Sequence, residues 1–410
     1  MMKARQMIFS ACVCFILCGP LLLFSSEKAG ISIPEDLTAK SAQYLSGGMS
    51  NVDVRSSFSL QSIVDGEFQN VIEKEIGNYV PAKANALLQY AAIQRHGIEI
   101  SNTLFNWSCY PTHYGSRYIY IPEKGALAGF PSTTAKWSGA ESFFESLNDY
   151  ARENTHMRFL VYIVAGREHL PDANPAFAMT SSSVPLSGFL EKVQKETSTP
   201  NITIETNCYL YDLETFYDEY FKSDLHWNIK GALRANEQIT EYLGLSNMKS
   251  CPISKLDDAL FSGTESRQSL CLICDEVNVA QDSFENLLIE KENGETSRGN
   301  EHLKYDTATQ MQRFFDFYGQ YYCDLENAKI TGGYGDATVL LVADSYGSAL
   351  ERPLANACAT LYHSDLLRGD RHSDATLDSQ LQRDTIDTVI FVGRIRDFES
   401  FNSRNPSYWN

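Results

Sequence analysis

Two polar segments, far apart in the chain, carry residue types that could together perform acyl transfer. In the first, Asp224 and His226 stand two positions apart within Asp224-Leu225-His226-Trp227. A carboxylate at this spacing can lie on the same side of an extended loop as the imidazole, fix its tautomer and stabilise the imidazolium. By itself the pair is also compatible with a surface turn beside a buried tryptophan, or with part of a metal site.

The second segment contains Ser345, which follows an apolar stretch from Thr338 to Ala343 and precedes a helix-compatible stretch at 349–361. This pattern predicts that Ser345 lies where a strand ends and a helix begins. A hydroxyl at such a place is exposed at the carboxyl edge of a sheet, and free amides at the helix start can stabilise an oxyanion. Serine is also a favoured helix N-cap, so plain capping is the alternative interpretation. Asp344 is expected to shape the turn by accepting a hydrogen bond from a backbone amide two residues on.

Taken together, the segments supply the nucleophile, base and orienting carboxylate that a serine acyl-transfer enzyme needs. The amide of Tyr346 is the best candidate for an oxyanion donor, and Trp227 and Arg394 are candidates for substrate binding. For Arg394, which follows a predicted strand, a solvated surface position is the alternative. Neither a metal nor an organic cofactor is expected. The lone C-x-x-C of Cys271 and Cys274 is weak evidence for a metal or redox site, because it has no second pair or nearby histidines.

The segments D-L-H-W-N and A-D-S-Y-G-S resemble those of the bacterial DHHW family and the related alginate O-acetyltransferases AlgJ and AlgX. The resemblance covers most of the chain beyond its amino-terminal segment, and it implies an SGNH-hydrolase-like fold in which the histidine segment precedes the serine. It also implies that Ser345 is the nucleophile, His226 the general base and Asp224 its orienting partner. Two positions depart from the family pattern: Leu225 replaces the first histidine of the DHHW name, and Ala343 replaces the glycine of the common Gly-Asp-Ser turn. The first departure leaves one histidine in the segment. One histidine is enough for a triad, and the loss of the other argues against a metal site with two histidine ligands.

Helices and apolar strands alternate along the chain, and this alternation predicts an α/β fold with a mostly parallel sheet flanked by helices. Such helix-then-strand pairs fall at 141–154 and 158–165, at 187–196 and 202–205, and at 377–384 and 388–392. A further strand is expected at 118–121, and two helices separated near Pro81 are expected between 66 and 95. We expect one α/β domain over 54–410, with an insertion at about 248–302, where the sequence turns polar and loses periodicity.

The amino-terminal segment and the overall charge narrow the possible location and partners of the protein. Lys3 and Arg5 precede an uncharged run from Met7 to Phe24, which is typical of an export signal and predicts that the remainder lies outside the cytoplasm. Residues 1–26 are therefore expected to be a signal peptide or signal anchor, and 27–53 a linker. The formal net charge of -18 disfavours nucleic acid and anionic lipid, because phosphate binding requires clustered Lys and Arg.

The leading functional hypothesis is an extracytoplasmic O-acyl transfer, in particular O-acetylation, onto a polysaccharide or other envelope glycan. Because acetyl-coenzyme A is cytoplasmic, the resemblance implies an integral-membrane acyltransferase partner that supplies the acyl group. A carbohydrate esterase is the second hypothesis, and it differs only in that water resolves the acyl-enzyme. A catalytically idle glycan-binding or envelope-assembly protein is the third, and it predicts a distance between Ser345 and His226 too long for a hydrogen bond, or a serine buried without a pocket.

Overall fold

The computed structural model describes residues 22, 25–26, 29–31, 83–105, 109–111, 117–121, 124–129, 138–167, 186–207, 212–245, 251–269, 273–280, 284–300, 327–366, 376–381, 386–399, 401–405 and 407–409. By their contacts they divide into two compact units, Met1–Leu127 with Ser262–Cys274 and Ala128–Phe261 with Asp275–Asn410. Among these described residues, no helix is both long and apolar enough to cross a bilayer. The predicted export segment, Met7 to Phe24, lies almost entirely outside them, as does the predicted linker at 27–53.

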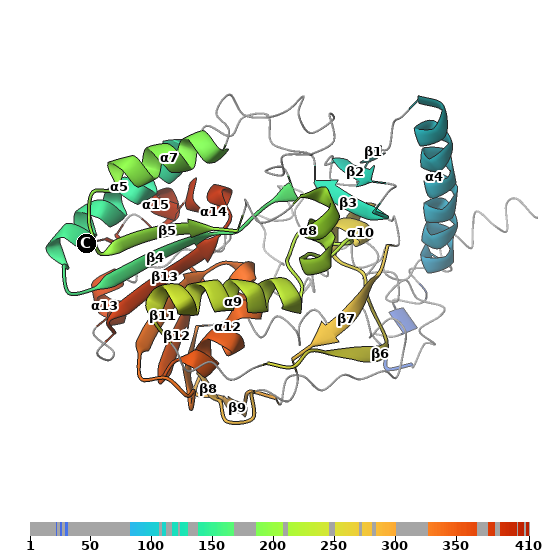
Figure 1. Ribbon diagram of the computed structural model, residues 1–410. Coiled ribbons are helices and arrows are strands. Elements are labelled where there is room, and N and C mark those ends of the chain that lie inside the picture. Colours follow the sequence, from blue (N-terminus) through green and yellow to red (C-terminus); the bar gives the residue numbers. More distant parts are fainter. Residues whose placement is uncertain are drawn as a thin grey trace, which may run out of the picture. The chain divides into compact units, whose positions relative to one another are not determined.

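The larger unit is built around a mixed sheet of eight strands (Figure 1). The strands are β4 (Arg158–Ile163), β5 (Ile202–Thr206), β8 (Leu288–Lys291), β9 (Thr296–Arg298), β10 (Ala328–Thr331), β11 (Thr338–Ala343), β12 (Thr360–Ser364) and β13 (Thr388–Gly393). Their order is β5-β4-β13-β11-β12-β10-β8-β9. The pairs from β5 to β12 are parallel, and the pairs from β12 to β9 are antiparallel. The predicted parallel sheet is therefore confirmed from the edge strand β5 to β12, and beyond β12 it is extended by antiparallel strands that were not predicted.

Burial explains why the central strands could be recognised. All of β13 is buried, and in β4 and β11 only the first residue is not. Strands covered on both faces have near-continuous runs of Val, Ile and Leu, as these three do. By contrast, β8 and β9 are short, partly exposed and polar, so their sequences carry no such run.

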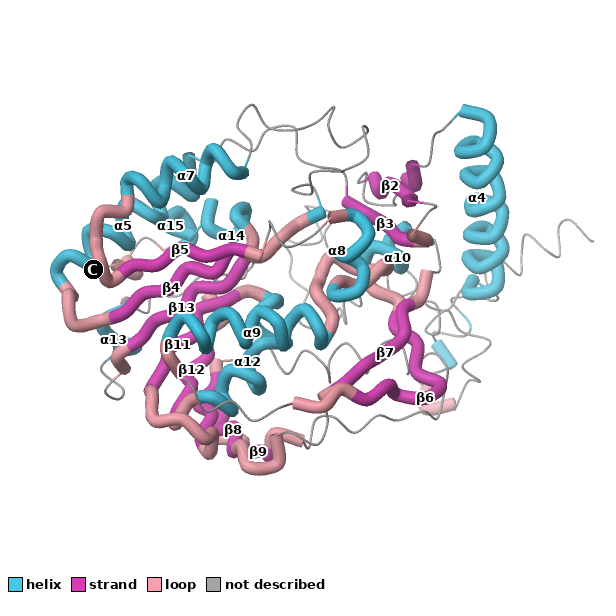
Figure 2. Tube along the Cα trace, in the orientation of Figure 1, coloured by secondary structure: helices cyan, strands magenta, loops and turns pink. Residues whose placement is uncertain are grey.

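Helices cover both faces of this sheet (Figure 2). On one face lie α5 (Ser138–Glu153), α7 (Leu186–Glu196), α14 (Ile395–Glu399) and α15 (Phe401–Arg404), and on the other lie α9 (Ile229–Leu243) and α12 (Ser345–Ala357). The part of the unit that the structure describes also contains the helices α8 (Leu213–Glu219) and α13 (Leu377–Leu381). Phe143 of α5 packs edge-on against Phe391 of β13 and Phe401 of α15, with ring centroids 5.3 Å apart in both pairs. This aromatic packing joins three sequence-distant elements over one face of the sheet.

The other described elements lie outside the large sheet. They are α4 (Lys83–Phe105), β1 (Cys109–Pro111), β2 (Arg117–Ile121), β3 (Ala126–Gly129), α10 (Thr264–Ser269), and the antiparallel pair β6 (Ser254–Phe261) and β7 (Asp275–Val279). The predicted strand at 118–121 is confirmed as β2, whereas the break near Pro81 lies outside the described residues. The stretch at about 248–302 contains α10 and four strands, of which β8 and β9 join the large sheet. That the stretch is an insertion stays a prediction.

The start of α12 is fixed by its N-cap and by close packing on β11. Asp344 is the N-cap, and its side chain accepts a hydrogen bond from the Tyr346 amide at 2.9 Å, as predicted. The alternative in which Ser345 caps the helix is therefore wrong, because Ser345 is the first helical residue. At Gly347 there is no room for a side chain, since an added Cβ would stand 2.2 Å from the Cβ of Ala343. The first turn of the helix thus lies directly on the end of the strand that precedes it.

Replacing Gly347 by alanine is expected to lower the free energy of unfolding by about 1–3 kcal/mol, because the added methyl overpacks this junction. The matched change is Gly97→Ala in α4, where an added Cβ has no neighbour within 4 Å. That variant is expected to be neutral or more stable by about 0.5–1 kcal/mol, since alanine is the better helix former. Urea unfolding of the full chain, followed by circular dichroism, measures both. Equal stabilities for the two variants would contradict the packing at Gly347.

Candidate active site

The fold brings the two polar segments together at the carboxyl edge of the sheet. Ser345 stands two residues beyond the end of β11, and its Oγ lies 2.6 Å from Nε2 of His226. The other ring nitrogen, Nδ1, lies 2.5 Å from Oδ1 of Asp224. A histidine that donates from Nδ1 to a carboxylate presents Nε2 as an acceptor for a hydroxyl. The three side chains therefore form a continuous chain of hydrogen bonds from serine to carboxylate.

Burial makes this chain of hydrogen bonds electrostatically strong. Asp224 is 0% exposed and His226 is 5% exposed, whereas Ser345 is partly accessible. Interactions between charged groups are stronger where water is excluded than at the surface. A hydroxyl at the accessible end and a carboxylate at the buried end is the arrangement required for a serine that is to be deprotonated in contact with a substrate.

The Asp224–His226 segment is a tight loop that doubles back on itself. The Phe221 amide donates to the carbonyl of His226 at 3.1 Å, and the Asn228 amide donates to the carbonyl of Glu219 at 2.8 Å. Asn228 then caps α9, accepting from the amides of Lys230 and Gly231. The loop is thereby closed at its base and leads directly into a helix that packs against α12.

Arg167, which follows the end of β4, holds this loop from one side. Its Nη2 donates to the carbonyls of Phe221 at 3.1 Å and Asp224 at 2.7 Å. The guanidinium carbon lies 5.2 Å from the ring centroid of Tyr217, and the residue is 7% exposed. A buried cation thus reaches the backbone of the residue whose carboxylate contacts His226. Sequence reasoning missed Arg167, although a charged residue just beyond a buried strand was an available signal.

Asp275, the first residue of β7, holds the same loop through its amides. Its carboxylate accepts from the backbone nitrogens of Lys222 at 2.8 Å and Ser223 at 2.9 Å, and from Ser223 Oγ at 2.5 Å. Burial raises the pKa of Asp275, the charge of Asp224 adds to the rise, and the hydrogen bonds from Ser223 and Lys222 oppose it. No local pattern in the sequence distinguishes Asp275 from the other acidic residues of its polar stretch. Its contact with the loop exists only in the folded chain.

A second carboxyl cluster lies behind the serine turn. Burial raises the pKa of Asp344 well above its usual range, and the charge of Asp397 and a hydrogen bond with it raise it further, while Arg394 opposes the shift. Arg394 contacts Asp397 twice, through its amide at 2.9 Å and its Nε at 3.5 Å from Oδ2. The two carboxyls are therefore held close together, with a cation beside them, under the N-terminus of α12.

The other three candidate residues, Trp227, Tyr346 and Arg394, differ in how accessible they are to a substrate. Trp227 is 0% exposed and packs edge-on against the ring of Tyr346 with centroids 5.4 Å apart, which speaks against contact with a substrate. The Tyr346 amide already donates to Asp344, so an oxyanion would have to share or replace that bond. Arg394 lies at the same sheet edge with 11% of its side chain exposed, and its guanidinium carbon is 5.4 Å from the Tyr346 ring centroid. Only Arg394 keeps an accessible side chain.

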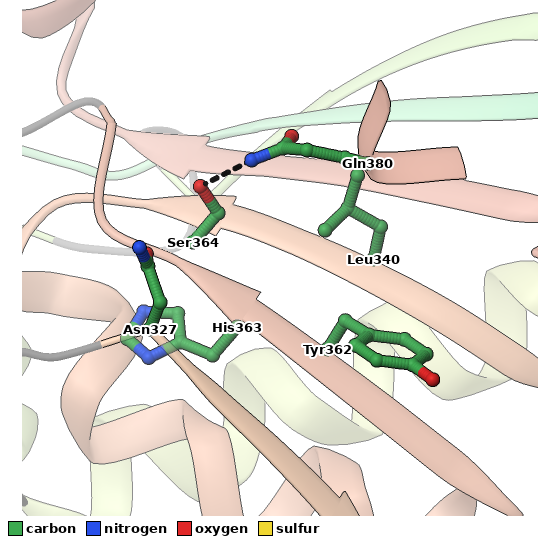
Figure 3. A pocket seen from close by; sticks show the side chains of 6 residues that line it. All are labelled: Asn327, Leu340, Tyr362, His363, Ser364 and Gln380. Carbon is green, nitrogen blue, oxygen red and sulfur yellow. Dashed lines mark hydrogen bonds between the residues drawn. The ribbon is translucent and has the colours of Figure 1, made fainter. Parts of the chain in front are cut away.

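A small cavity lies beside β12 and is separate from these residues (Figure 3). Its lining consists of Asn327, Leu340, Tyr362, His363, Ser364 and Gln380. The volume of about 10 Å³ is the size of one water molecule, so no substrate binds there. Gln380 donates to Ser364 Oγ across it at 3.0 Å. Within the described residues, there is no group of three or more His, Cys, Asp or Glu side chains that could hold a metal ion.

No protein-family model matches the sequence, and no curated protein matches it. Solved structures do match. A DHHW family protein from Eubacterium siraeum is 14% identical with a TM-score of 0.54, over 73% of this chain and 98% of that one. PatB1 of Bacillus cereus is 17% identical with a TM-score of 0.51, over 67% and 94%, and its structure with a sulfonyl adduct is 16% identical with a TM-score of 0.52, over 70% and 98%.

The O-acetyltransferase domain of Pseudomonas putida AlgJ, 12% identical over 67% of this chain and 89% of that one, has a TM-score of only 0.34, too loose a likeness to support an argument. At these identities the likeness establishes the fold and leaves the chemistry to be argued from the site. The predicted resemblance is confirmed at that level: this chain has the fold of a DHHW family protein and of PatB1.

Proposed function

We propose that the protein is a serine-dependent O-acyltransferase that acetylates an extracytoplasmic polysaccharide or other glycan. The observation that carries the proposal is the unbroken chain from Ser345 Oγ through His226 to Asp224, with distances of 2.6 and 2.5 Å. The acetyl group and the glycan acceptor are suggested by the resemblance of the two sequence segments to the DHHW family and the alginate O-acetyltransferases. The fold shared with a DHHW family protein supports an SGNH-like architecture.

The proposed reaction has two halves that use the same three residues. In the first, His226 Nε2 takes the proton of Ser345, and Oγ attacks the acyl carbonyl of the donor. His226 then protonates the departing oxygen, leaving an ester on Ser345. In the second, His226 takes the proton of a sugar hydroxyl, which attacks that ester, and His226 returns the proton to Ser345 Oγ as the acetylated sugar leaves. In both halves Asp224 stabilises the imidazolium and holds the ring in place.

Charge stabilisation during the reaction is assigned to the helix start and to Arg394. A tetrahedral intermediate formed at Ser345 lies at the N-terminus of α12, where the helix dipole favours negative charge. The Tyr346 amide can contribute if the oxyanion replaces the Asp344 carboxyl as its acceptor. We assign substrate binding to Arg394, because its cation lies at this edge and part of its side chain is accessible. Buried Trp227 instead supports the ring of Tyr346.

The amino-terminal sequence supports the proposed location, and the family resemblance supports the proposed partners. Lys3, Arg5 and the apolar run from Met7 to Phe24 support export, with the segment either cleaved or retained as an anchor. An acyltransferase outside the cytoplasm needs an activated acyl group delivered across the membrane. An integral-membrane acyltransferase would supply it, and the glycan would be the acceptor.

The hydrogen-bond geometry favours an enzyme over the idle glycan-binding alternative. An idle protein was expected to show either a distance between Ser345 and His226 too long for a hydrogen bond or a serine buried without a pocket. The observed 2.6 Å and the partial exposure of Ser345 show neither feature. A carbohydrate esterase has the same geometry, so only the fate of the acyl group separates it from a transferase.

We expect Ser345→Ala and His226→Ala each to lower kcat for hydrolysis of p-nitrophenyl acetate by the full chain at least about a thousandfold, because neither half of the pair acts alone. The matched control is Ser348→Ala, three residues further along the same helix, where the buried hydroxyl has no hydrogen-bond partner. It should keep wild-type kcat. Circular dichroism must show all variants folded. An inactive wild type, or active Ser345→Ala and His226→Ala variants, would rule out the proposal.

Acyl transfer and hydrolysis differ in whether a sugar hydroxyl or water receives the acyl group from Ser345. With p-nitrophenyl acetate as donor and neutral glucan or N-acetylglucosamine oligosaccharides as acceptors, we expect acetate release to fall as acceptor rises, because sugar hydroxyls compete with water for the ester on Ser345. Mass spectrometry should show the oligosaccharide heavier by one acetyl group. Acetate as the sole product at every acceptor concentration would instead support the esterase.

A further inference from the structure

The side chain of Tyr346 connects the two segments that form the candidate active site. Tyr346 follows Ser345 in the chain, yet its hydroxyl donates to the carbonyl oxygen of Leu225 at 2.6 Å. Leu225 lies between Asp224 and His226. One residue of the serine turn is thus bonded directly to the backbone of the histidine loop, and it is 1% exposed, so water competes little for the bond.

The bond fixes the peptide group that carries His226. The oxygen of the Leu225–His226 peptide accepts from the Tyr346 hydroxyl, and the N–H of the same peptide donates to Asp224 Oδ1 at 3.1 Å. Both edges of one planar unit are therefore held. Because the orientation of this plane sets the direction of the Cα–Cβ bond of His226, it determines where Nε2 lies relative to Ser345 Oγ.

The ring of Tyr346 is itself held firmly. It lies 4.8 Å from the imidazole of His226 and 5.4 Å from the ring of Trp227, centroid to centroid, and the guanidinium carbon of Arg394 is 5.4 Å from its centroid. Contacts of this kind contribute packing and cation–π stabilisation. The hydroxyl therefore has little freedom to move away from Leu225.

We propose that Tyr346 is a positioning residue whose hydroxyl holds the histidine loop in register with the serine, so that the loop follows the nucleophile if the helix moves. The inference rests on the proposed function for its kinetic consequence, although the tether itself is a property of the fold. It assigns to the side chain of Tyr346 a role separate from that of its backbone amide.

The test is Tyr346→Phe, which keeps the ring and removes the tether. We expect kcat for p-nitrophenyl acetate to fall about 30-fold with KM within about twofold, since a small displacement of a base costs rate more than ground-state binding. The matched control is Tyr162→Phe in β4, another tyrosine 1% exposed, whose hydroxyl bonds Gln238 Oε1 at 2.5 Å. It should retain wild-type kcat. A kcat for Tyr346→Phe within twofold of wild type would overturn the proposal.

A second readout does not depend on activity. In the full chain labelled with ¹⁵N-histidine, a His226 Nδ1 proton bonded to a buried carboxylate should give a low-field resonance, assigned by its loss in His226→Ala. Tyr346→Phe is expected to broaden this resonance or shift it to higher field, and Tyr162→Phe to leave it unchanged. An unchanged resonance in Tyr346→Phe would contradict the tether. If wild type is inactive while the resonance responds as expected, the proposed function fails and the tether stands.

Discussion

The buried carboxylate of Asp224 is the constraint on which the rest of the site depends. It is fully buried, and an isolated ionised carboxylate in such surroundings is too costly to maintain. The Nδ1 and backbone nitrogens of His226 lie 2.5 and 3.1 Å from its Oδ1, and the cation of Arg167 reaches its backbone carbonyl. These contacts stabilise the charge only while the loop keeps one conformation. The loop backbone must therefore be fixed as firmly as the side chains.

That requirement explains where the surrounding polar groups direct their hydrogen bonds. Arg167 and Tyr346 donate to carbonyls of the loop, and Asp275 accepts from two of its amides. Loop peptides have no sheet or helix partners, so buried ones need side chains to satisfy them. The three residues come from the end of β4, the start of α12 and the start of β7. The histidine loop is thus held by elements that are distant in sequence, whereas the backbone of Ser345 is placed by the strand before it and the helix that it begins.

The serine turn and the histidine loop are consequently held in place by different kinds of interaction. The serine turn is positioned by a buried strand, an N-cap and the close contact at Gly347, which are local and rigid. Behind it, buried Asp344 and the partly buried pair Asp397 and Arg394 place fixed polar groups at the helix start. A site whose dipoles and charges are oriented before a substrate arrives needs little reorganisation during reaction. The proposed acyl transfer makes use of that preorganisation.

The sequence by itself determined the central α/β pattern, because strands buried on both faces must be apolar throughout, as β4, β11 and β13 are. It also determined the turn at Asp344, since an N-cap acts over two residues, and it singled out Ser345, His226 and Asp224 by residue type and resemblance. Only the tertiary structure decided that these residues meet, that Trp227 is buried, and that β8 and β9 extend the sheet. It alone brought Arg167, Asp275 and the Tyr346 hydroxyl to the loop. The physical reason is that contacts between distant segments leave no periodicity in either segment.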